Sequence, residues 1–214
     1  MPLVYQHTIN NNTRLGVWRI TEPETFFRER VPLLLDVKHP HKRLQHLAGR
    51  YLLAELHPGF PVNEICIADS RKPYLPDNRL HFSISHCGYF AAAIVSTKQQ
   101  VGIDIEVPTA TIFKIAQKFL RDEETRLLQE RMSSGQLLET ITLLWSAKET
   151  LFKWHGKGGI DFRKHLHVQQ VTGNNEEGRI SASFEKENPV TLTLDYRIFE
   201  ELLLTWTATP PRTG

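Results

Sequence analysis

Cysteine is scarce in this chain, which has only two among its 214 residues. Cys66 and Cys87 make neither a disulfide framework nor the spacing of a zinc site, so we interpret both as free thiols in a reducing compartment. The stretch MPLVYQHTINNNTRLG lacks the basic start and apolar run of a signal peptide. No apolar run approaches the ~20 residues that cross a bilayer. The sequence therefore predicts a cytoplasmic protein without a membrane partner.

Strong charge of one sign and the common phosphate-binding loops are missing as well. The formal net charge of +2 is too small to indicate a nucleic-acid partner, but it is compatible with a small anionic ligand. Neither G-x-x-x-x-G-K-[ST] nor G-x-G-x-x-G occurs, which argues against the common nucleotide-binding enzymes. What the chain does have is 40% hydrophobic and 23% charged residues, a composition that can bury a core.

Strand and helix patterns follow one another in two stretches of similar design. In the first, Thr21 and Glu24 form a capping-box signature that predicts a helix start, and apolar spacing predicts a helix over 42–56. Alternation predicts strands over 14–20, 64–69, 80–88 and 89–97. In the second, we expect a strand over 101–106, helices near 110–120, 122–132 and 136–155, and strands near 165–172, 179–185, 190–198 and 202–208. The pattern indicates an α+β fold with an N-terminal half over 1–100 and a C-terminal half over 101–214.

The stretch QQVGIDIEVP has an unusual polar face. Gly102, Asp104 and Glu106 alternate with apolar residues, so the two carboxylates fall on the same side of the expected strand. A solvated polar face is the ordinary interpretation. The alternative is that the two carboxylates share one cation, because like charges this close repel each other otherwise.

The helix in LLWSAKETLFKWHGKG raises a second question. Lys148 falls inside its apolar stripe, where a lysine must reach water or meet an anion. Glu149 and Lys153 lie together on the flank of the stripe. An ordinary pair at this spacing contributes only ~0.3–0.5 kcal/mol, but three ionisable residues beside the core edge favour a functional site.

The stretch FSISHCG places His86 at the end of a strand, directly after Ser85. A lone histidine in a turn is usually structural. Here Arg71 and Lys72 stand in the loop before the strand, and such donors are able to converge on phosphate oxygens.

Taken together, these segments resemble the 4′-phosphopantetheinyl transferases, in the larger single-chain type that acts on carrier proteins. The family pattern is (V/I)-G-(I/V)-D-(I/V/L)-E followed, after a spacer, by W/F-(S/C/T)-x-K-E-(S/A)-x-x-K. VGIDIE and WSAKETLFK match it except at Thr150, where Ser or Ala is usual. RKPYLP and HFSISHCG resemble the family's G-K-P and F-N-x-S-H-S-G segments, from which Arg71, Ser83 and Cys87 depart. The resemblance covers about residues 40–160.

The resemblance implies transfer of the 4′-phosphopantetheine arm of coenzyme A to a serine of an apo acyl or peptidyl carrier protein, with release of adenosine 3′,5′-bisphosphate. It implies Mg²⁺ held by Asp104, Glu106 and Glu149, since magnesium prefers hard oxygen ligands. Lys153 is expected to steady charge on the pyrophosphate. The base that takes the serine proton is expected to be Glu149 or Glu124.

Binding residues for coenzyme A follow from the same resemblance. Ser85 and His86 are expected at its 3′-phosphate, and Lys72 near the adenine nucleotide. The other cationic candidates for binding coenzyme A are Lys148, Lys153, Arg43 and Arg50, of which the two arginines are candidates for a further phosphate contact.

The implied fold has two related α+β halves, each with a small antiparallel sheet and a long helix, around a pseudo-twofold axis. Coenzyme A is expected in the cleft between them, and a monomer is expected because one chain supplies both sides. Two alternatives stay open: another magnesium-dependent nucleotide or phosphoryl transferase, and a non-catalytic relative that binds coenzyme A. The carrier protein and the acceptance of acyl-coenzyme A are also open.

Overall fold

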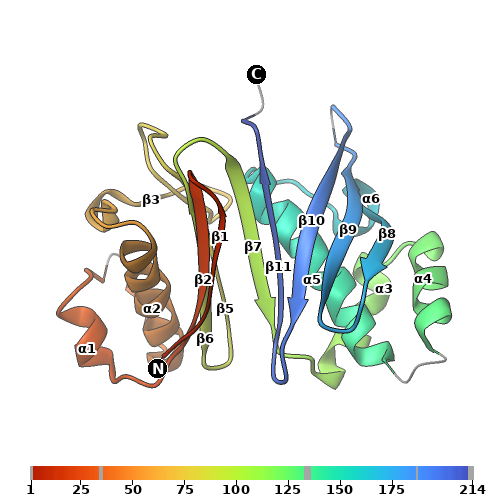
Figure 1. Ribbon diagram of the computed structural model, residues 1–214, viewed down its shortest axis with the longest axis horizontal. Coiled ribbons are helices and arrows are strands. Elements are labelled where there is room, and N and C mark those ends of the chain that lie inside the picture. Colours follow the sequence, from red (N-terminus) through yellow and green to blue (C-terminus); the bar gives the residue numbers. More distant parts are fainter. Residues whose placement is uncertain (1, 34–35, 133–135, 187, 212–214) are drawn as a thin grey trace. The chain divides into compact units, whose positions relative to one another are not determined.

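The computed structural model describes residues 2–33, 36–132, 136–186 and 188–211, which form two compact units (Figure 1). Unit 1 comprises the chain up to Ile103 together with the residues from Ala208, and unit 2 comprises Asp104–Thr207. Both combine helices with an antiparallel sheet, in agreement with an α+β fold. The end of the chain groups with unit 1, whereas the sequence pattern places it in the second half. The pseudo-twofold relation stays a prediction.

Unit 1 is built on a four-stranded sheet. Its strands are β1 (Leu3–Asn10), β2 (Thr13–Arg19), β5 (His81–Cys87) and β6 (Phe90–Ser96), paired antiparallel in the order β1-β2-β6-β5. The sequence pattern does not predict β1, because most of its residues are exposed and the alternation is weak. β6 lies inside the sheet and is buried along its whole length.

Helix α2 (Pro40–Leu56) packs on this sheet against β2, β5 and β6. Proline suits its first position, because the N–H that proline lacks would have no partner there. Helix α1 (Glu24–Arg28) packs on α2. It begins after Pro23 with no side-chain cap, so the capping box predicted for Thr21 is wrong. The core between helices and sheet includes Trp18, Phe27, Leu47, Leu52, Leu53, Phe82 and Val95.

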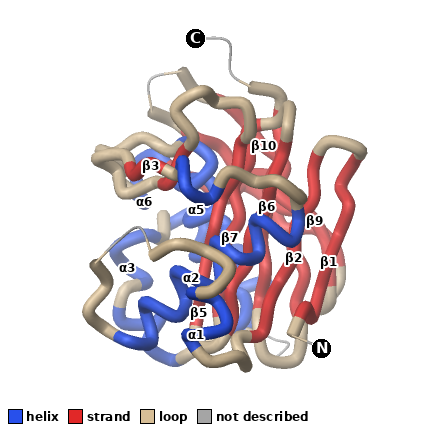
Figure 2. Tube along the Cα trace, turned by 90° about the vertical axis from the view of Figure 1, so that its left-hand side faces the viewer, coloured by secondary structure: helices blue, strands red, loops and turns tan. Residues whose placement is uncertain are grey.

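The segment between α2 and β5 has little regular structure. It contains the short helix η1 (Val62–Glu64) and a ribbon of β3 (Cys66–Ile67) and β4 (Pro73–Tyr74). Figure 2 shows β3 surrounded by loops. The strand predicted over 64–69 is therefore reduced to two residues. Arg71 and Lys72 stand in the turn that joins β3 to β4.

Unit 2 is built on a five-stranded sheet of β7 (Gln100–Glu106), β8 (Leu166–Gly173), β9 (Glu177–Phe184), β10 (Val190–Ile198) and β11 (Leu203–Thr209), in the order β7-β11-β10-β9-β8. The boundary between the units falls within β7 and β11. Helix α5 (Leu137–His155) packs on β8 and β9. It ends at Gly156, whose φ of 78° is left-handed and suits glycine.

Four short helical segments complete unit 2: η2 (Ala110–Lys114), α3 (Ala116–Phe119), α4 (Asp122–Met132) and α6 (Phe162–His165). The core beneath them includes Phe119, Leu144, Leu151, Trp154, Val168, Phe184 and Leu194. In the described part of the chain, no helix is both long and apolar enough to cross a membrane.

Gly49 allows α2 to lie close to β5, because a β-carbon there would lie 2.6 Å from Cγ2 of Ile84. Gly49→Ala gains about 1 kcal/mol of helix propensity, but overpacking typically costs about 1–3 kcal/mol. We expect the variant to have a lower free energy of unfolding, measured by urea titration.

Ile84→Ala provides the control, because it removes the methyl group that the new β-carbon would meet. In that background Gly49→Ala should become neutral or stabilising. A stabilising effect of Gly49→Ala in the parent protein would show that the close approach is not a constraint.

Candidate active site

Strand β7 and helix α5 supply the acidic residues of the candidate site in unit 2. Asp104 and Glu106 lie on β7, and Glu149 lies on α5. Asp104 is only 3% exposed, and its Oδ1 accepts a hydrogen bond of 2.6 Å from Nζ of Lys153. A solvated polar face is therefore the wrong interpretation for Asp104, which is buried and ion-paired.

The surroundings of Glu149 raise the pKa of its carboxyl group. Burial and then the negative charge of Asp104 raise this pKa from its ordinary value to about 7. The ammonium of Lys153 acts in the opposite direction, and the charge of Glu106 adds a further upward contribution. Carboxylates that repel one another in this way are stabilised by a shared cation.

Trp145 fixes the orientation of Glu106. Its indole Nε1 donates a hydrogen bond of 2.9 Å to Oε1 of the carboxylate. The indole ring packs edge-on against Phe119 and stacks on Phe162, with centroids 5.1 and 5.4 Å apart. Rings on two sides leave the indole little freedom, so the carboxylate of Glu106 is held in place.

Among the residues that the structure describes, no group of three or more His, Cys, Asp or Glu side chains has the arrangement of a ready metal site. The chemistry of Asp104, Glu106 and Glu149 nevertheless fits magnesium. They offer hard oxygen donors, and burial together with the charges of Asp104 and Glu106 raises the pKa of Glu149. Magnesium at these residues stays a prediction.

Lys148 and Glu124 form an ion pair in the interior of unit 2. Nζ lies 2.7 Å from Oε2, and both side chains are fully buried. The ammonium also donates to the carbonyl oxygens of Phe119 at 2.5 Å and Phe162 at 3.2 Å. The lysine therefore uses its donors within the protein.

Both carboxylate oxygens of Glu124 also accept hydrogen bonds from within the protein. Oε2 accepts the backbone N–H of Arg121 at 2.8 Å, and Oε1 accepts that of Val168 at 2.7 Å. Burial lowers the pKa of Lys148, although the adjacent charge of Glu124 opposes this.

These contacts bear on two expectations, both of which stay predictions. Lys148 does meet an anion, as its place in the apolar stripe requires, but the anion is Glu124 and not coenzyme A. Glu124 is shielded from solvent and already accepts three hydrogen bonds, so its carboxylate is not open to solvent in this structure. Burial is the physical reason that the two side chains pair with each other.

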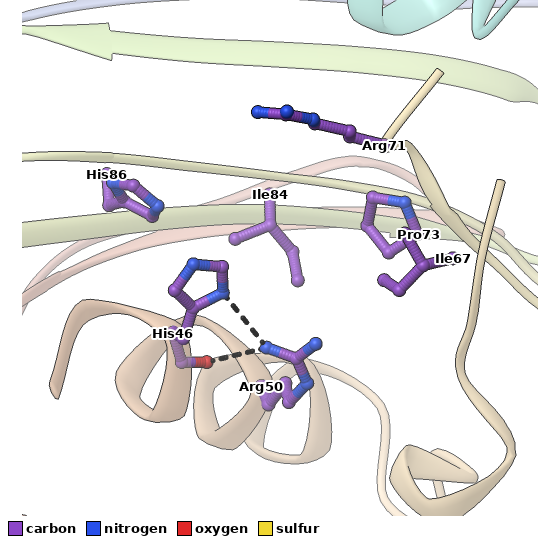
Figure 3. Close-up of a pocket in the computed structure, with 7 residues that line it drawn as sticks. All are labelled: His46, Arg50, Ile67, Arg71, Pro73, Ile84 and His86. Carbon is purple, nitrogen blue, oxygen red and sulfur yellow. Dashed lines mark hydrogen bonds between the residues drawn. The ribbon is translucent and has the colours of Figure 1, made fainter. Parts of the chain in front are cut away.

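Unit 1 contains a cavity of about 440 Å³ that is rich in nitrogen donors (Figure 3). Its lining consists of His46, Arg50, Ile67, Arg71, Pro73, Ile84 and His86, which we call the cationic pocket. His46 and Arg50 rise from α2 toward β5, which carries His86, and Arg71 reaches over Ile84 in the direction of His86. The lining includes no acidic residue, so the pocket suits an anion.

Arg50 is the most buried cation of this pocket, with 4% exposure. Its Nη1 donates to the carbonyl oxygen of His46 at 3.1 Å, and its Nε has no hydrogen-bond partner among the described residues. Burial lowers the pKa of Arg50. Burial, followed by the charges of Arg50 and Lys42, also lowers the pKa of His46. An anionic ligand would relieve the cost of burying this guanidinium.

The structure brings together only some of the expected contacts for coenzyme A. His86 and Arg50 line the cationic pocket. Ser85 is buried and points to the opposite face of the sheet from His86, because neighbours on a strand alternate. Lys72 lines a different cavity of about 90 Å³ beside His81, where burial lowers its pKa to about 8.

Arg43 is engaged elsewhere. Its Nε and Nη2 bind the carboxylate of Glu24 at 2.9 and 2.8 Å, and Nη1 donates to the carbonyl oxygen of Val37 at 3.0 Å. The guanidinium joins α1 to α2, so its expected role at a phosphate is not supported. Sequence reasoning missed His46, although the four-residue spacing to Arg50 on a helix places both on one face.

Removing one partner of the Lys148–Glu124 pair should be strongly destabilising. Glu124→Gln leaves a buried ammonium without its counter-charge, and we expect a loss of about 3–5 kcal/mol in the free energy of unfolding by urea. Adding Lys148→Met should restore a large part of the loss, because no buried charge then remains.

The exposed pair of Arg163 and Asp122, 2.9 Å apart, is the matched control. Arg163→Gln should cost less than about 1 kcal/mol, as surface pairs do. A loss of the same size for Glu124→Gln would contradict the importance of the buried pair.

Comparison with known proteins agrees with this geometry. A family model described as the 4′-phosphopantetheinyl transferase superfamily matches residues 100–203. Enterobactin synthase component D of Salmonella typhi is 36% identical over 115 residues, which cover 52% of this chain and 47% of that protein. The match thus spans about half of that relative's length.

Two relatives from Escherichia coli match over a longer stretch. The 4′-phosphopantetheinyl transferase AcpT of strain O157:H7 is 29% identical over 161 residues, 72% of this chain and 80% of its own. Enterobactin synthase component D of strain K12 is 31% identical over 166 residues, 72% of this chain and 76% of its own. The chain belongs to the 4′-phosphopantetheinyl transferase superfamily.

Proposed function

We propose that this protein transfers the 4′-phosphopantetheine arm of coenzyme A to a serine of an apo acyl or peptidyl carrier protein and releases adenosine 3′,5′-bisphosphate. The observation that carries the proposal is the cluster of Asp104, Glu106 and Glu149 with Lys153 on β7 and α5 of unit 2. The family membership and the cationic pocket support it.

The carboxylates of this cluster are proposed to hold Mg²⁺. When bound, the ion would neutralise charge on the pyrophosphate of coenzyme A. Trp145 keeps Glu106 oriented for this task through its hydrogen bond. Lys153 is placed by its ion pair with Asp104 and is proposed to donate to a pyrophosphate oxygen, which stabilises the leaving group.

At phosphorus, the reaction forms one bond and breaks one, and the serine proton passes to a base. The serine Oγ bonds to the phosphorus that carries pantetheine, and the bond from that phosphorus to the bridging oxygen of the pyrophosphate breaks. Adenosine 3′,5′-bisphosphate leaves with that oxygen. Glu149 is proposed to take the serine proton, directly or through a water, because Glu124 is buried and fully hydrogen-bonded.

Mass spectrometry of an apo carrier domain tests the activity. With coenzyme A and magnesium, the carrier should gain one phosphopantetheine, and an equal amount of adenosine 3′,5′-bisphosphate should appear.

Asp104→Asn keeps the size of a buried side chain but removes its charge, so transfer should be lost while the melting temperature is kept.

Cys87→Ser is the control for this assay and should keep most of the activity, because no covalent role is assigned to the thiol. A loss above about 100-fold, roughly 2.7 kcal/mol, would contradict this. No mass gain on any apo carrier from fatty-acid, polyketide or peptide synthesis would refute the proposed function.

A magnesium titration tests the role of Glu149. Glu149→Gln should raise the magnesium concentration for half-maximal rate, because one charged ligand is lost. Excess metal should restore only the part of the rate lost through weaker metal binding, because the amide of glutamine cannot take the serine proton. Glu139→Gln changes an exposed carboxylate in the first turn of the same helix and should leave the titration unchanged. Identical curves for Glu149→Gln and the parent would exclude the ligand role.

A further inference from the structure

The backbone of Arg71 adopts a conformation that its side chain disfavours. Its φ is +65°, in the left-handed region where glycine is the usual residue. The turn is fixed on both sides, because Arg71 N donates to the carbonyl oxygen of Ala68 at 2.8 Å and Ala68 N donates to that of Lys72 at 3.0 Å. A strained non-glycine residue at such a position points to a use for its side chain.

That side chain lines the cationic pocket. The pocket already holds the buried guanidinium of Arg50, and neither arginine takes part in an ion pair among the described residues. Arg79, only a few residues away in the chain, pairs with Glu64 at 2.7 Å and Asp77 at 2.8 Å. Arg79 is thus neutralised by two carboxylates, whereas no carboxylate of the described residues lines the pocket of Arg50 and Arg71, although Arg71 is exposed like Arg79.

The charge of this pocket matches one part of the proposed substrate. A phosphate monoester carries about −1.5 to −2 charges at neutral pH and three terminal oxygens. Two guanidinium groups and the ring nitrogens of His46 and His86 offer donors for such a group. The same cavity has apolar lining from Ile67, Pro73 and Ile84. Its volume of about 440 Å³ leaves room for the nucleoside attached to the phosphate.

We propose that Arg71 is a specificity-determining residue that binds the 3′-phosphate monoester of coenzyme A and so favours coenzyme A over 3′-dephospho-coenzyme A. This inference rests on the proposed function. Arginine suits the role because its planar group donates two parallel hydrogen bonds to phosphate oxygens. A competing role, stacking of the guanidinium on adenine, makes no distinction between these two ligands.

Calorimetric binding of coenzyme A and of 3′-dephospho-coenzyme A to the full chain, without a carrier, tests the proposal. Arg71→Gly should weaken binding of coenzyme A by about 10- to 100-fold, the effect of losing a charged hydrogen bond. Binding of 3′-dephospho-coenzyme A should change less than about 2-fold, because this ligand lacks the phosphate that Arg71 is proposed to bind. The ratio of the two affinities therefore falls.

The free energy of unfolding of Arg71→Gly should stay close to that of the parent. Glycine adopts a positive φ without strain, and this gain offsets the greater freedom of glycine in the unfolded chain. Arg71→Lys keeps the charge but not the paired donors and should retain an intermediate ratio of the two affinities.

Two control variants are matched to Arg71→Gly. Asn78→Gly changes the other non-glycine residue with positive φ, 52°, in the part of the chain that the structure describes, and Arg79→Ala removes a paired arginine. Both should keep the ratio of the parent.

Three results would overturn the proposal: a parent protein that binds both ligands equally, an unchanged ratio in Arg71→Gly, or an equal loss for both ligands, which would indicate stacking on adenine. The failure of the proposed function looks different. In that case the parent protein binds no coenzyme A and modifies no carrier, whereas transfer with an unchanged ratio refutes the role of Arg71 alone.

Discussion

The buried ion pair of Lys148 and Glu124 is the constraint on which unit 2 depends. Two charges can be taken out of water only if nearly all their hydrogen bonds are made, and here they are. The ammonium reaches the carbonyl oxygens that end α3 and begin α6, and the carboxylate receives a backbone N–H of β8. A single pair thus connects α5 with α3, α4, α6 and β8 and fixes the rotation of α5 about its axis. Because Glu149 follows Lys148 directly, this rotation also decides where the candidate site lies.

The cationic pocket of unit 1 depends on a different constraint, the close approach of α2 and β5. Gly49 has no side chain to separate them, and His46 and Arg50 flank it on the same helix. The approach brings the ring of His46 to 5.4 Å from that of His86 on β5. In both units, one contact of the long helix tolerates little change, and the candidate site residues stand next to that contact.

Periodicity in the sequence predicts the two elements that carry the candidate site. The strand expected over 101–106 is β7, and the helix expected over 136–155 is α5, because each has a strong apolar pattern. The partner of Lys148 was not predictable in this way, since Glu124 lies on another helix and only tertiary packing joins them. The same holds for Ser85 and His86, where adjacency in sequence suggests a common site and the alternation of a strand separates them. Patterns therefore locate elements, while the pairing of buried charges follows from the packing.

The two units contain sites of opposite charge, a cluster of carboxylates in unit 2 and the cationic pocket in unit 1. Three carboxylates and one ammonium gather in unit 2, where burial and then the charge of Asp104 raise the pKa of Glu149 and make its ionised form costly. The pocket of unit 1 gathers guanidinium groups without a carboxylate, and Arg50 is buried there at a similar cost. Neither surplus helps the protein to fold, so each is better explained by a ligand that relieves it. A cation suits the first site, and a phosphate suits the second.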